Sequence, residues 1–516
     1  MDTILILDFG SQTTQLIARR IREVRVYSRI VPGDRPLRAE DLVDVKGIVL
    51  SGSPHSVHDA DAPVPTPSVY AAGVPVLGIC YGLQRLVHDH GGRVERNERR
   101  EYGRARQHVR SDHPLFASIP DGFGSWMSHG DSIAEPPQGA TLLSESEHGL
   151  AGAVAFPDHD YVGIQFHPEV THTEYGTKLL ENFAVGICGA AREWTMDRYA
   201  EDAASEIRRQ VGDKPVLLLI SGGVDSTVTA AMLLAALPAP QVHLMYIDTG
   251  LMRHRETEDV RQGLEALGAQ HLHIVDAEAE FLGGLSGVTD PEEKRRIIGD
   301  TFVRVQETEI RHHVPGDYIL AQGTLYTDYV ESGRGVGTKA RVIKSHHNVR
   351  SPLIEAKREA GEVVEPLIHL YKDEVRVLGA QLGVRDSIIR RHPFPGPGLA
   401  VRILGEVSKE RCELLRAVDR TYISELERRN LYDEIWQAFA VLLPIRSVGV
   451  TGDERGYGHV VALRAVGSRD GMTAEVYPFP TDDLLEISAL ITNRHPAVGR
   501  VVYDVSSKPP ATIEWE

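Results

Sequence analysis

The sequence predicts an α/β protein with two parallel-sheet α/β domains followed by a small α+β domain. Two stretches of the chain alternate short apolar segments with amphipathic ones, the first from the N-terminus and the second from Val216. Such alternation of strands and helices is typical of parallel sheets. A segment rich in proline and glycine at 392–399 separates the second stretch from a third with a different pattern. With 516 residues, the chain is also too long for one hydrophobic core.

The first alternation predicts an N-terminal domain over residues 1–192. Its expected strands are 4–10, 45–51 and 74–79, with helices at 13–23 and from Tyr81 onward. Shorter strands are expected at 103–109 and 162–166, and the amphipathic segment 177–188 is expected to close the domain as a helix. We place the domain boundary near Arg192.

The second alternation predicts an α/β domain over residues 193–392. Expected strands are 216–220, 242–248, 271–275 and 317–322, with helices at 227–236 and 256–267. The segment 325–350 has three glycines and no clear period, so we expect a mobile loop over an active site.

The segment HPFPGPGL at 392–399 cannot continue a helix or a central strand and marks the second boundary. The third domain, 393–516, is expected to contain a helix at 409–428 and strands at 446–450, 459–465 and 500–505.

Charge and cysteine content favour a cytoplasmic enzyme of small molecules. The net charge of −17, from 56 basic and 73 acidic residues, argues against nucleic acid or anionic membrane as a partner. No apolar run approaches the length of a membrane span, and the N-terminal segment fits a buried strand better than a signal peptide. Three cysteines make a disulfide framework improbable, which suits a reducing compartment.

Cys80 lies on a tight turn between an apolar strand and a helix, with Gly78 and Gly82 on either side. This arrangement is typical of a nucleophile elbow, and a helix N-terminus favours the reactive thiolate. Taken alone, Cys80 fits a structural cysteine better than a catalytic one. The segment QFHPEV favours the catalytic interpretation, because it places His167 and Glu169 two residues apart after an apolar run. In an extended chain this spacing points both side chains to one face, where they can act as a base and its orienting group.

GICYGLQ and QFHPEV together resemble the motifs of class I glutamine amidotransferases, over about residues 1–192. The resemblance implies that Cys80 attacks the glutamine carboxamide, that His167 transfers protons and that Glu169 holds the histidine. The family usually has a glycine before the proline of its oxyanion loop, where this chain has Ser53. A positive φ at this position would strain a serine.

The segment SGGVDST follows a predicted buried strand and opens a helix, which is typical of a phosphate-binding loop. A plain glycine turn would explain the glycines but not the aspartate among hydroxyls. The segment resembles the loop of ATP pyrophosphatases, which implies ATP binding, with Asp225 as the Mg²⁺ ligand. The expected ATP-binding residues are Ser221, Gly222, Gly223, Val224, Asp225, Ser226 and Thr227.

Further motifs extend the resemblance to the glutamine-hydrolysing GMP synthetase family, in which a class I amidotransferase is fused to an N-type ATP pyrophosphatase. They include IDTGLM at 247–252, HPFPGPGLAVRILGEV at 392–407 and SSKPPATIEWE at 506–516. This resemblance implies a homodimer that uses glutamine, ATP and XMP to make GMP. It implies that XMP is held by Arg295, Gln437, Lys508, Ile513 and Glu514, and that Asp328, Glu331 and Lys344 belong to a lid.

Two alternatives remain open from the sequence. The first is another glutamine-fed adenylating ligase, which would share Cys80 and Asp225 but lack the C-terminal third. The second is a nucleotide-binding regulatory protein that has lost catalysis.

One departure from the family concerns the expected lid. The family usually has two glycines after the motif IKSHHNV, where this chain has Arg350 and Ser351, so we expect the motion of the lid to differ from that of the family.

Overall fold

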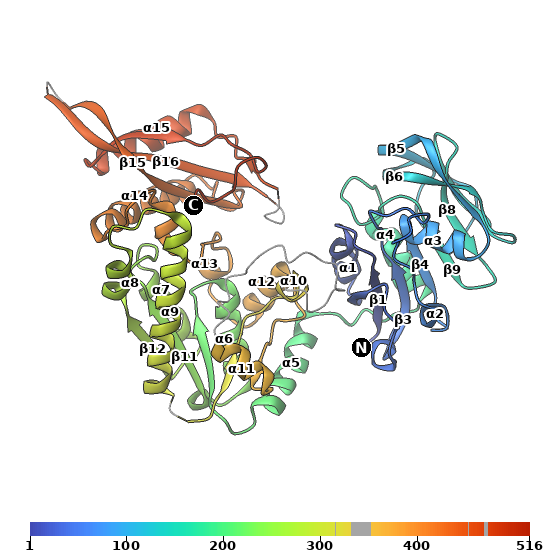
Figure 1. Ribbon diagram of the computed structural model, residues 1–516, viewed down its shortest axis with the longest axis horizontal. Helices are drawn as coiled ribbons and strands as arrows, with labels where there is room; N and C mark the ends of the chain where they lie inside the picture. The colour runs from blue at the N-terminus through green and yellow to red at the C-terminus, as the bar shows by residue number, and fades with distance from the viewer. Residues whose placement is uncertain (315, 332–351, 452–453, 469–472) are drawn as a thin grey trace. The chain divides into compact units, whose positions relative to one another are not determined.

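The computed structural model describes residues 1–314, 316–331, 352–451, 454–468 and 473–516. The chain forms two compact units, which Figure 1 shows and which are described separately here. The first comprises Met1–Tyr199 with the described residues 327–331, and the second comprises Ala200–Tyr326 with the described residues from 352 to the C-terminus. The predicted three-domain division at 192 and 392 stays a prediction.

The first unit is built on a nine-stranded sheet in the order β2-β1-β3-β4-β9-β8-β7-β5-β6. Strands β2, β1, β3, β4 and β9 are parallel, and β8, β7, β5 and β6 continue the sheet in antiparallel pairs. The strands are β1 (Thr3–Asp8), β2 (Tyr27–Pro32), β3 (Val45–Leu50), β4 (Val76–Ile79), β5 (Arg93–Val109), β6 (Phe123–Glu135), β7 (Thr141–Ser146), β8 (Ala151–Phe156) and β9 (Tyr161–Ile164). The expected strands at 4–10, 45–51, 74–79 and 162–166 correspond to β1, β3, β4 and β9, and the one at 103–109 to the end of β5, whereas β2, β6, β7 and β8 were not predicted.

Short helices flank this sheet. They are α1 (Thr14–Glu23), η1 (Ala39–Leu42), α2 (Pro67–Tyr70), α3 (Tyr81–Asp89), η2 (Pro114–Phe116), α4 (Gly176–Glu181) and the π-helical segment η3 (Asn182–Ile187). The single helix expected at 177–188 is therefore divided, because the last six residues switch to the wider π-helical turn.

The second unit contains a five-stranded parallel sheet in the order β12-β11-β10-β13-β14. Its strands are β10 (Val216–Ile220), β11 (Val242–Asp248), β12 (His271–Asp276), β13 (Ile319–Ala321) and β14 (Val363–Val364). The associated helices are α5 (Met196–Val211), α6 (Val224–Ala236), η4 (Ala239–Gln241), α7 (Glu256–Ala266), α8 (Glu278–Leu285), α9 (Pro291–His313), α11 (Pro352–Glu359), α12 (Lys372–Gln381) and α13 (Asp386–Ile389). Helix α10 (Tyr326–Glu331) starts at Tyr326, and its other residues are assigned to the first unit. β10 reads VLLLI, the continuous apolar run expected of a strand covered on both faces.

A second, four-stranded sheet follows η5 (Gly398–Arg402) and α14 (Lys409–Arg428) in the same unit. It is formed by β15 (Gln437–Thr451), β16 (Glu454–Gly467), β17 (Glu475–Val476) and β18 (Val498–Tyr503), with α15 (Thr481–Arg494) before the last strand. One hydrophobic cluster joins Phe281 and Leu251 to Leu415 and Leu463, so the two sheets share a core. At the predicted boundary, Leu399 N–H donates to Leu251 O at 2.8 Å.

Histidines gather between β11, β12 and α9. The rings of His243 and His271 stack with centroids 4.6 Å apart, and His273 lies 4.4 Å from His313. His243 Nδ1 is 3.2 Å from His273 Nε2, so these two rings share one proton in a hydrogen bond. Burial and, after it, the neighbouring histidines together lower the pKa of His273 to about 4.

This cluster predicts a loss of stability in mild acid. The pKa of His273 in the folded protein lies below its ordinary 6.5, so the fold has full stability above pH 6.5 and loses it as the pH falls towards 4. After allowance for partial exposure, we expect a loss of about 1–2 kcal/mol. Thermal unfolding at pH 7.5 and 5.0 should show a smaller pH shift for His273→Gln than for the wild type. Equal shifts would show that the cluster does not control acid stability.

Candidate functional site

Cys80 occupies a strained turn between β4 and α3. Its backbone has φ 54° and ψ −107°, a conformation that a non-glycine residue rarely adopts. The turn needs glycine on both sides: a Cβ at Gly82 would lie 2.3 Å from Leu50 O, and one at Gly78 would lie 2.6 Å from the Gly82 carbonyl carbon. The close approach of strand and helix holds the thiol at the helix N-terminus, as in a nucleophile elbow.

His167 and Glu169 meet Cys80 just beyond the end of β9. His167 Nδ1 lies 2.7 Å from Glu169 Oε1, and His167 also hydrogen-bonds Cys80. All three side chains are buried, with Cys80 6% and Glu169 0% exposed. A nucleophile, a base and a carboxylate that orients the base are therefore assembled in one chain of contacts.

Opposing effects set the protonation of His167. Burial lowers its pKa, but the Glu169 carboxylate and the hydrogen bonds with Cys80 and Glu169 raise the pKa well above its usual value. The site therefore favours an imidazolium, which stabilises a thiolate beside it. Such a pair supplies both the nucleophile and the acid for the leaving group.

The loop 51–54 approaches the same pair. A Cβ on Gly52 would lie 3.5 Å from His167 Cε1, an ordinary van der Waals contact, and 3.3 Å from Ser11 Oγ, which is slightly tight, so the backbone at Gly52 lies directly against the catalytic imidazole. Ser53 lies outside the left-handed region, so the strain considered for serine there does not arise. The first N–H groups of α3, beginning with Tyr81, have no partner within the helix and can stabilise an oxyanion.

Sequence reasoning missed Gln165 as a neighbour of the thiol. Its Nε2 donates to Cys80 Sγ at 3.7 Å, and its Oε1 accepts from Gln84 Nε2 at 3.3 Å. The motif QFHPEV contains this glutamine, and its place directly after the apolar strand was the available signal.

The second cluster surrounds the loop between β10 and α6. Gly222 has φ +79°, and Ser221 Oγ accepts from Gly223 N at 3.3 Å. Ser226 Oγ lies 3.1 Å from Ser221 Oγ, and Thr227 Oγ1 donates to Gly223 O at 2.9 Å. The loop is shaped by its own hydroxyls, and the free N–H groups at the start of α6 are left for a phosphate.

Asp225 has one oxygen paired and one available. Oδ2 forms an ion pair with Lys372 on α12, whereas Oδ1 is buried without a hydrogen-bond partner. Within the described residues, no group of three or more His, Cys, Asp or Glu side chains is arranged to hold a metal. Magnesium commonly uses one or two carboxylates with phosphate oxygens and water. Asp225 Oδ1 is therefore suited to be a carboxylate ligand of Mg²⁺. Lys372, the ion-pair partner of Oδ2, is a neighbour that the sequence did not indicate.

The C-terminal tail packs into the four-stranded sheet. Ile513 is 9% exposed and lies in a cluster with Phe439 and Val466. Glu514 accepts from Gln437 Nε2 at 2.7 Å and from Arg402 at 2.8 and 3.0 Å.

Lys508 and Arg295, also predicted to contact XMP, belong to other segments of the chain. Lys508 pairs through its backbone with Ala474. Arg295 is exposed on α9, with its guanidinium 3.6 Å from Glu292. The adjacent Lys294 is the one that reaches the tail: it is fully buried, donates to Ile403 O at 2.7 Å and pairs with Glu516. Asp328 and Glu331 lie on α10, and Lys344 lies outside the described residues, as do Arg350 and Ser351.

Comparisons with known proteins bear on all parts of the chain. Residues 5–187 match the model of class-I glutamine amidotransferases, 203–294 that of asparagine synthase and 424–515 that of the GMP synthase C-terminal domain. The chain is 49% identical over 99% of its length to "GMP synthase [glutamine-hydrolyzing]" of Aquifex aeolicus, of which it covers 99%. It is 50% identical to a protein of that name from Thermus thermophilus, over 99% of this chain and 100% of the relative.

Proposed function

Because the chain belongs to the family of glutamine-hydrolysing GMP synthases, we propose that its two clusters of residues divide glutamine-dependent GMP synthesis between them. The Cys80 cluster releases ammonia from glutamine. The loop 221–227 binds ATP for the adenylation of XMP. The observation that carries this proposal is the contact chain Cys80–His167–Glu169, together with a phosphate loop elsewhere in the same polypeptide.

In the glutaminase half, the Cys80 thiolate attacks the carboxamide carbon of glutamine. The protonated His167 gives its proton to the departing nitrogen, so the C–N bond breaks and ammonia leaves a thioester behind. Water then attacks the thioester while His167 accepts its proton, and glutamate departs with the thiolate restored. N–H groups at the start of α3 stabilise the oxyanion in both steps.

Glu169 acts as a positioning residue for His167. Glu169→Gln keeps the shape but removes the charge that raises the pKa of His167, so we expect glutaminase kcat/KM to fall about 10²–10⁴-fold. The alkaline limb of the kcat/KM profile, where His167 loses the proton that it gives to the leaving nitrogen, should also move to lower pH. Ammonium-dependent GMP formation serves as the internal control and should remain. A variant with unchanged glutaminase activity would remove this role from Glu169.

In the synthetase half, the C2 oxygen of XMP attacks the α-phosphorus of ATP, and the bond to the β-phosphate oxygen breaks to release pyrophosphate. Ammonia then attacks C2, and AMP leaves with that oxygen to give GMP. Backbone N–H groups of loop 221–227 hold the phosphates of ATP. Asp225 Oδ1 would hold Mg²⁺, which neutralises phosphate charge when it is bound.

For XMP, the joined side chains of Gln437 and Glu514 support a binding role next to Ile513, and Lys508 remains a proposed contact. Arg402 holds Glu514 through two hydrogen bonds and so positions its carboxylate. Arg295 supports the proposal through its exposed guanidinium, which is suited to a phosphate. Asp328, Glu331 and Lys344 remain proposed lid residues.

Product analysis tests the whole reaction. With glutamine labelled by ¹⁵N in its amide, ATP and XMP, we expect one labelled GMP, one AMP and one pyrophosphate for each glutamate. Preferred turnover of another acceptor would favour a different ligase. Binding of ATP and XMP without AMP formation would favour a regulatory protein.

We also propose that the chain forms a homodimer through the sheet of β15 and β16. Val448 and Tyr457 are cross-strand partners with 48% and 70% exposure, and Ile445 is 56% exposed. A pair of exposed apolar side chains on a two-stranded ribbon suits contact with a second copy of the chain.

A cytoplasmic location is proposed from the free thiols of Cys80, Cys188 and Cys412. None of the helices in the described part of the chain could span a bilayer.

Sedimentation tests the dimer. We expect the wild type to sediment as a dimer and the double variant Val448→Asp with Tyr457→Asp to sediment mainly as a monomer. Val43→Asp is a matched control, because Val43 is a 62%-exposed apolar residue of the first unit. A monomeric wild type would contradict the proposal.

A further inference from the structure

A pocket of about 370 Å³ lies in the first unit at the opposite ends of the strands that carry the glutaminase residues. It begins at Pro75, just before β4, and at Asp160, just before β9. Cys80 follows the other end of β4, and His167 lies just beyond the other end of β9. The pocket therefore shares two strands with the Cys80 cluster but none of its side chains.

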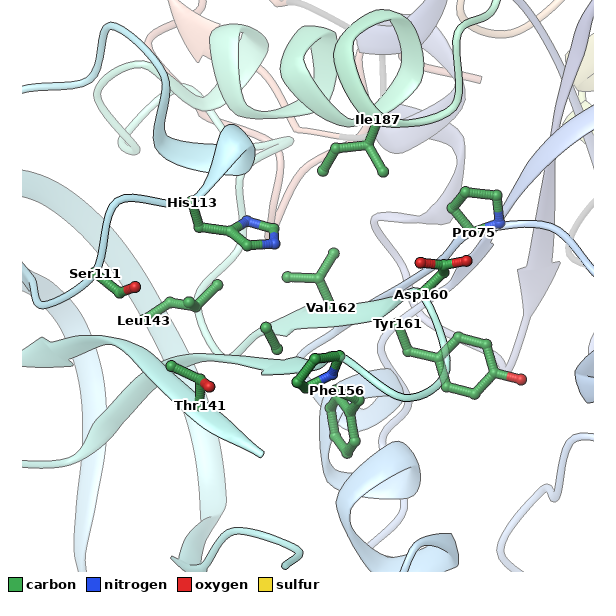
Figure 2. Close-up of a pocket in the computed structure, with 12 residues that line it drawn as sticks. Pro75, Ser111, His113, Thr141, Leu143, Phe156, Asp160, Tyr161, Val162 and Ile187 are labelled. Carbon is green, nitrogen blue, oxygen red and sulfur yellow. The ribbon is translucent and has the colours of Figure 1, made fainter. Parts of the chain in front are cut away.

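The pocket has an apolar interior. Leu143 and Val162 are buried on the sheet, and Ile187 of η3 faces them across the space that Figure 2 shows. Buried Ala155 of β8 lines the same space, whereas the ring of Phe156 is on the other face of the sheet, in a cluster with Leu83 and Val154. Apolar side chains on two sides, in a volume of this size, suit a small flat ring system.

Polar groups stand at the edge of this interior. The Asp160 carboxylate makes no hydrogen bond or ion pair through its side chain with any described residue, and Thr141 and Ser111 contribute hydroxyls. His113 Nδ1 accepts the Leu115 N–H at 3.2 Å, so in the neutral ring the proton is on Nε2. Burial lowers the pKa of His113, which favours this neutral form.

The charge of the lining limits the ligand. Asp160 is its one carboxylate, and the described residues that line the pocket include no lysine or arginine. A phosphate or carboxylate would therefore be unpaired, whereas an uncharged molecule with hydrogen-bond donors would pair with Asp160. Acceptors on the other edge of the same molecule would suit His113 Nε2–H and the hydroxyls.

We propose that this pocket binds an unphosphorylated purine with an exocyclic amine, of the guanine type, and that occupancy alters the glutaminase centre through β4 and β9. The ring N–H and the amine of guanine form adjacent donors that match one carboxylate, and its opposite edge carries acceptors. β4 and β9 pair directly from Val76–Tyr161 to Ile79–Ile164, so the ligand and Cys80 lie at the two ends of one ladder. The choice of guanine rests on the proposed function, because guanine is the base of the proposed end product. The binding of a small uncharged ring in this pocket does not depend on that function.

Titration calorimetry of the full chain with guanosine tests the site. We expect saturable binding with a submillimolar dissociation constant, and binding of inosine, which lacks the amine, about tenfold weaker. Asp160→Asn should weaken guanosine binding about tenfold or more, because a hydrogen bond to a charged group is lost. Asp160 has φ 51°, which asparagine also tolerates, so the turn is expected to keep its shape.

Asp158→Asn is the matched control, because it removes the same charge from the same β8–β9 turn outside the pocket. It should bind guanosine like the wild type. Thr141→Val provides a second variant that keeps the volume and should weaken binding severalfold. Guanosine should also change the glutaminase rate of the wild type but not that of Asp160→Asn.

Three results would overturn the proposal: no saturable binding, binding equal in Asp160→Asn and Asp158→Asn, or a glutaminase rate that guanosine leaves unchanged. Because binding is measured without turnover, failure here is distinct from failure of GMP synthesis.

Discussion

Replacing Cys80 with alanine is expected to abolish glutamine-dependent GMP formation and to leave ammonium-dependent formation largely intact. The variant removes the only atom that forms a covalent bond with glutamine in the proposed mechanism. Loss of such a nucleophile typically costs more than about a thousandfold in rate. The loop at 221–227 and its contacts are in the second unit and do not involve this side chain. The measurement is GMP formation with glutamine and, separately, with a saturating ammonium salt.

The other two cysteines provide the control. Burial raises the pKa of Cys188 to about 12 and the pKa of Cys412 to about 11, so both remain thiols near neutral pH. Cys412→Ser should retain glutamine use if the protein folds, and Cys188→Ala should retain it fully. If Cys80→Ala still formed GMP from glutamine at the wild-type rate, the nucleophile would have to be another residue. Loss of the ammonium-dependent activity would point to a structural role for Cys80.

The local apolar patterns were enough to predict most of the parallel strands. β10 and β11 have the predicted bounds, because a continuous apolar run flanked by turn residues has little alternative to a buried strand. α14 also agrees with the prediction at both ends, where Ser408 caps the first turn by accepting from Arg411 N.

The antiparallel half of the first sheet could not be predicted in the same way. β5 is long and rich in charged residues, so only its end at 103–109 was expected as a strand, and β6 mixes polar and apolar residues without a continuous apolar run. Their pairing depends on contacts between residues far apart in the chain, which no local period reveals. Strand β2 was missed because YSRIVP is short and mixes polar with apolar residues.

The candidate sites show the same division. Cys80, His167 and the loop 221–227 lie at ends of strands, where topology places chemical groups together. The neighbours that complete each cluster come from distant positions: Lys372 is 147 residues from Asp225, and Arg402 is 112 residues from Glu514. Lys294 and Arg295 are adjacent cations in one helix, so only the helix orientation shows that Lys294 is the one facing the tail.

Replacing Asp225 with alanine is expected to abolish GMP formation with either nitrogen source. Its buried Oδ1 is the proposed Mg²⁺ ligand beside the phosphate loop, and its Oδ2 holds Lys372. Removal of both functions should lower pyrophosphate release about 10²–10⁴-fold, since positioning and charge neutralisation provide most of the catalysis in phosphoryl chemistry. Glutamine hydrolysis without nucleotides should remain. The measurement is pyrophosphate release with XMP, ATP and ammonium at several Mg²⁺ concentrations.

Two further variants separate the metal role from the ion pair. Asp225→Asn retains the volume but is a weaker Mg²⁺ ligand, so part of its lost activity should return at high Mg²⁺. Lys372→Met breaks the ion pair and leaves the carboxylate, so its Mg²⁺ dependence should stay near that of the wild type. Asp213→Ala, an exposed acid in the turn before β10, should behave like the wild type. Normal pyrophosphate release by Asp225→Ala would contradict the metal role of Asp225. The same conclusion would follow if Lys372→Met needed more Mg²⁺ than the wild type while Asp225→Asn did not, and the metal would then have to be held by other residues.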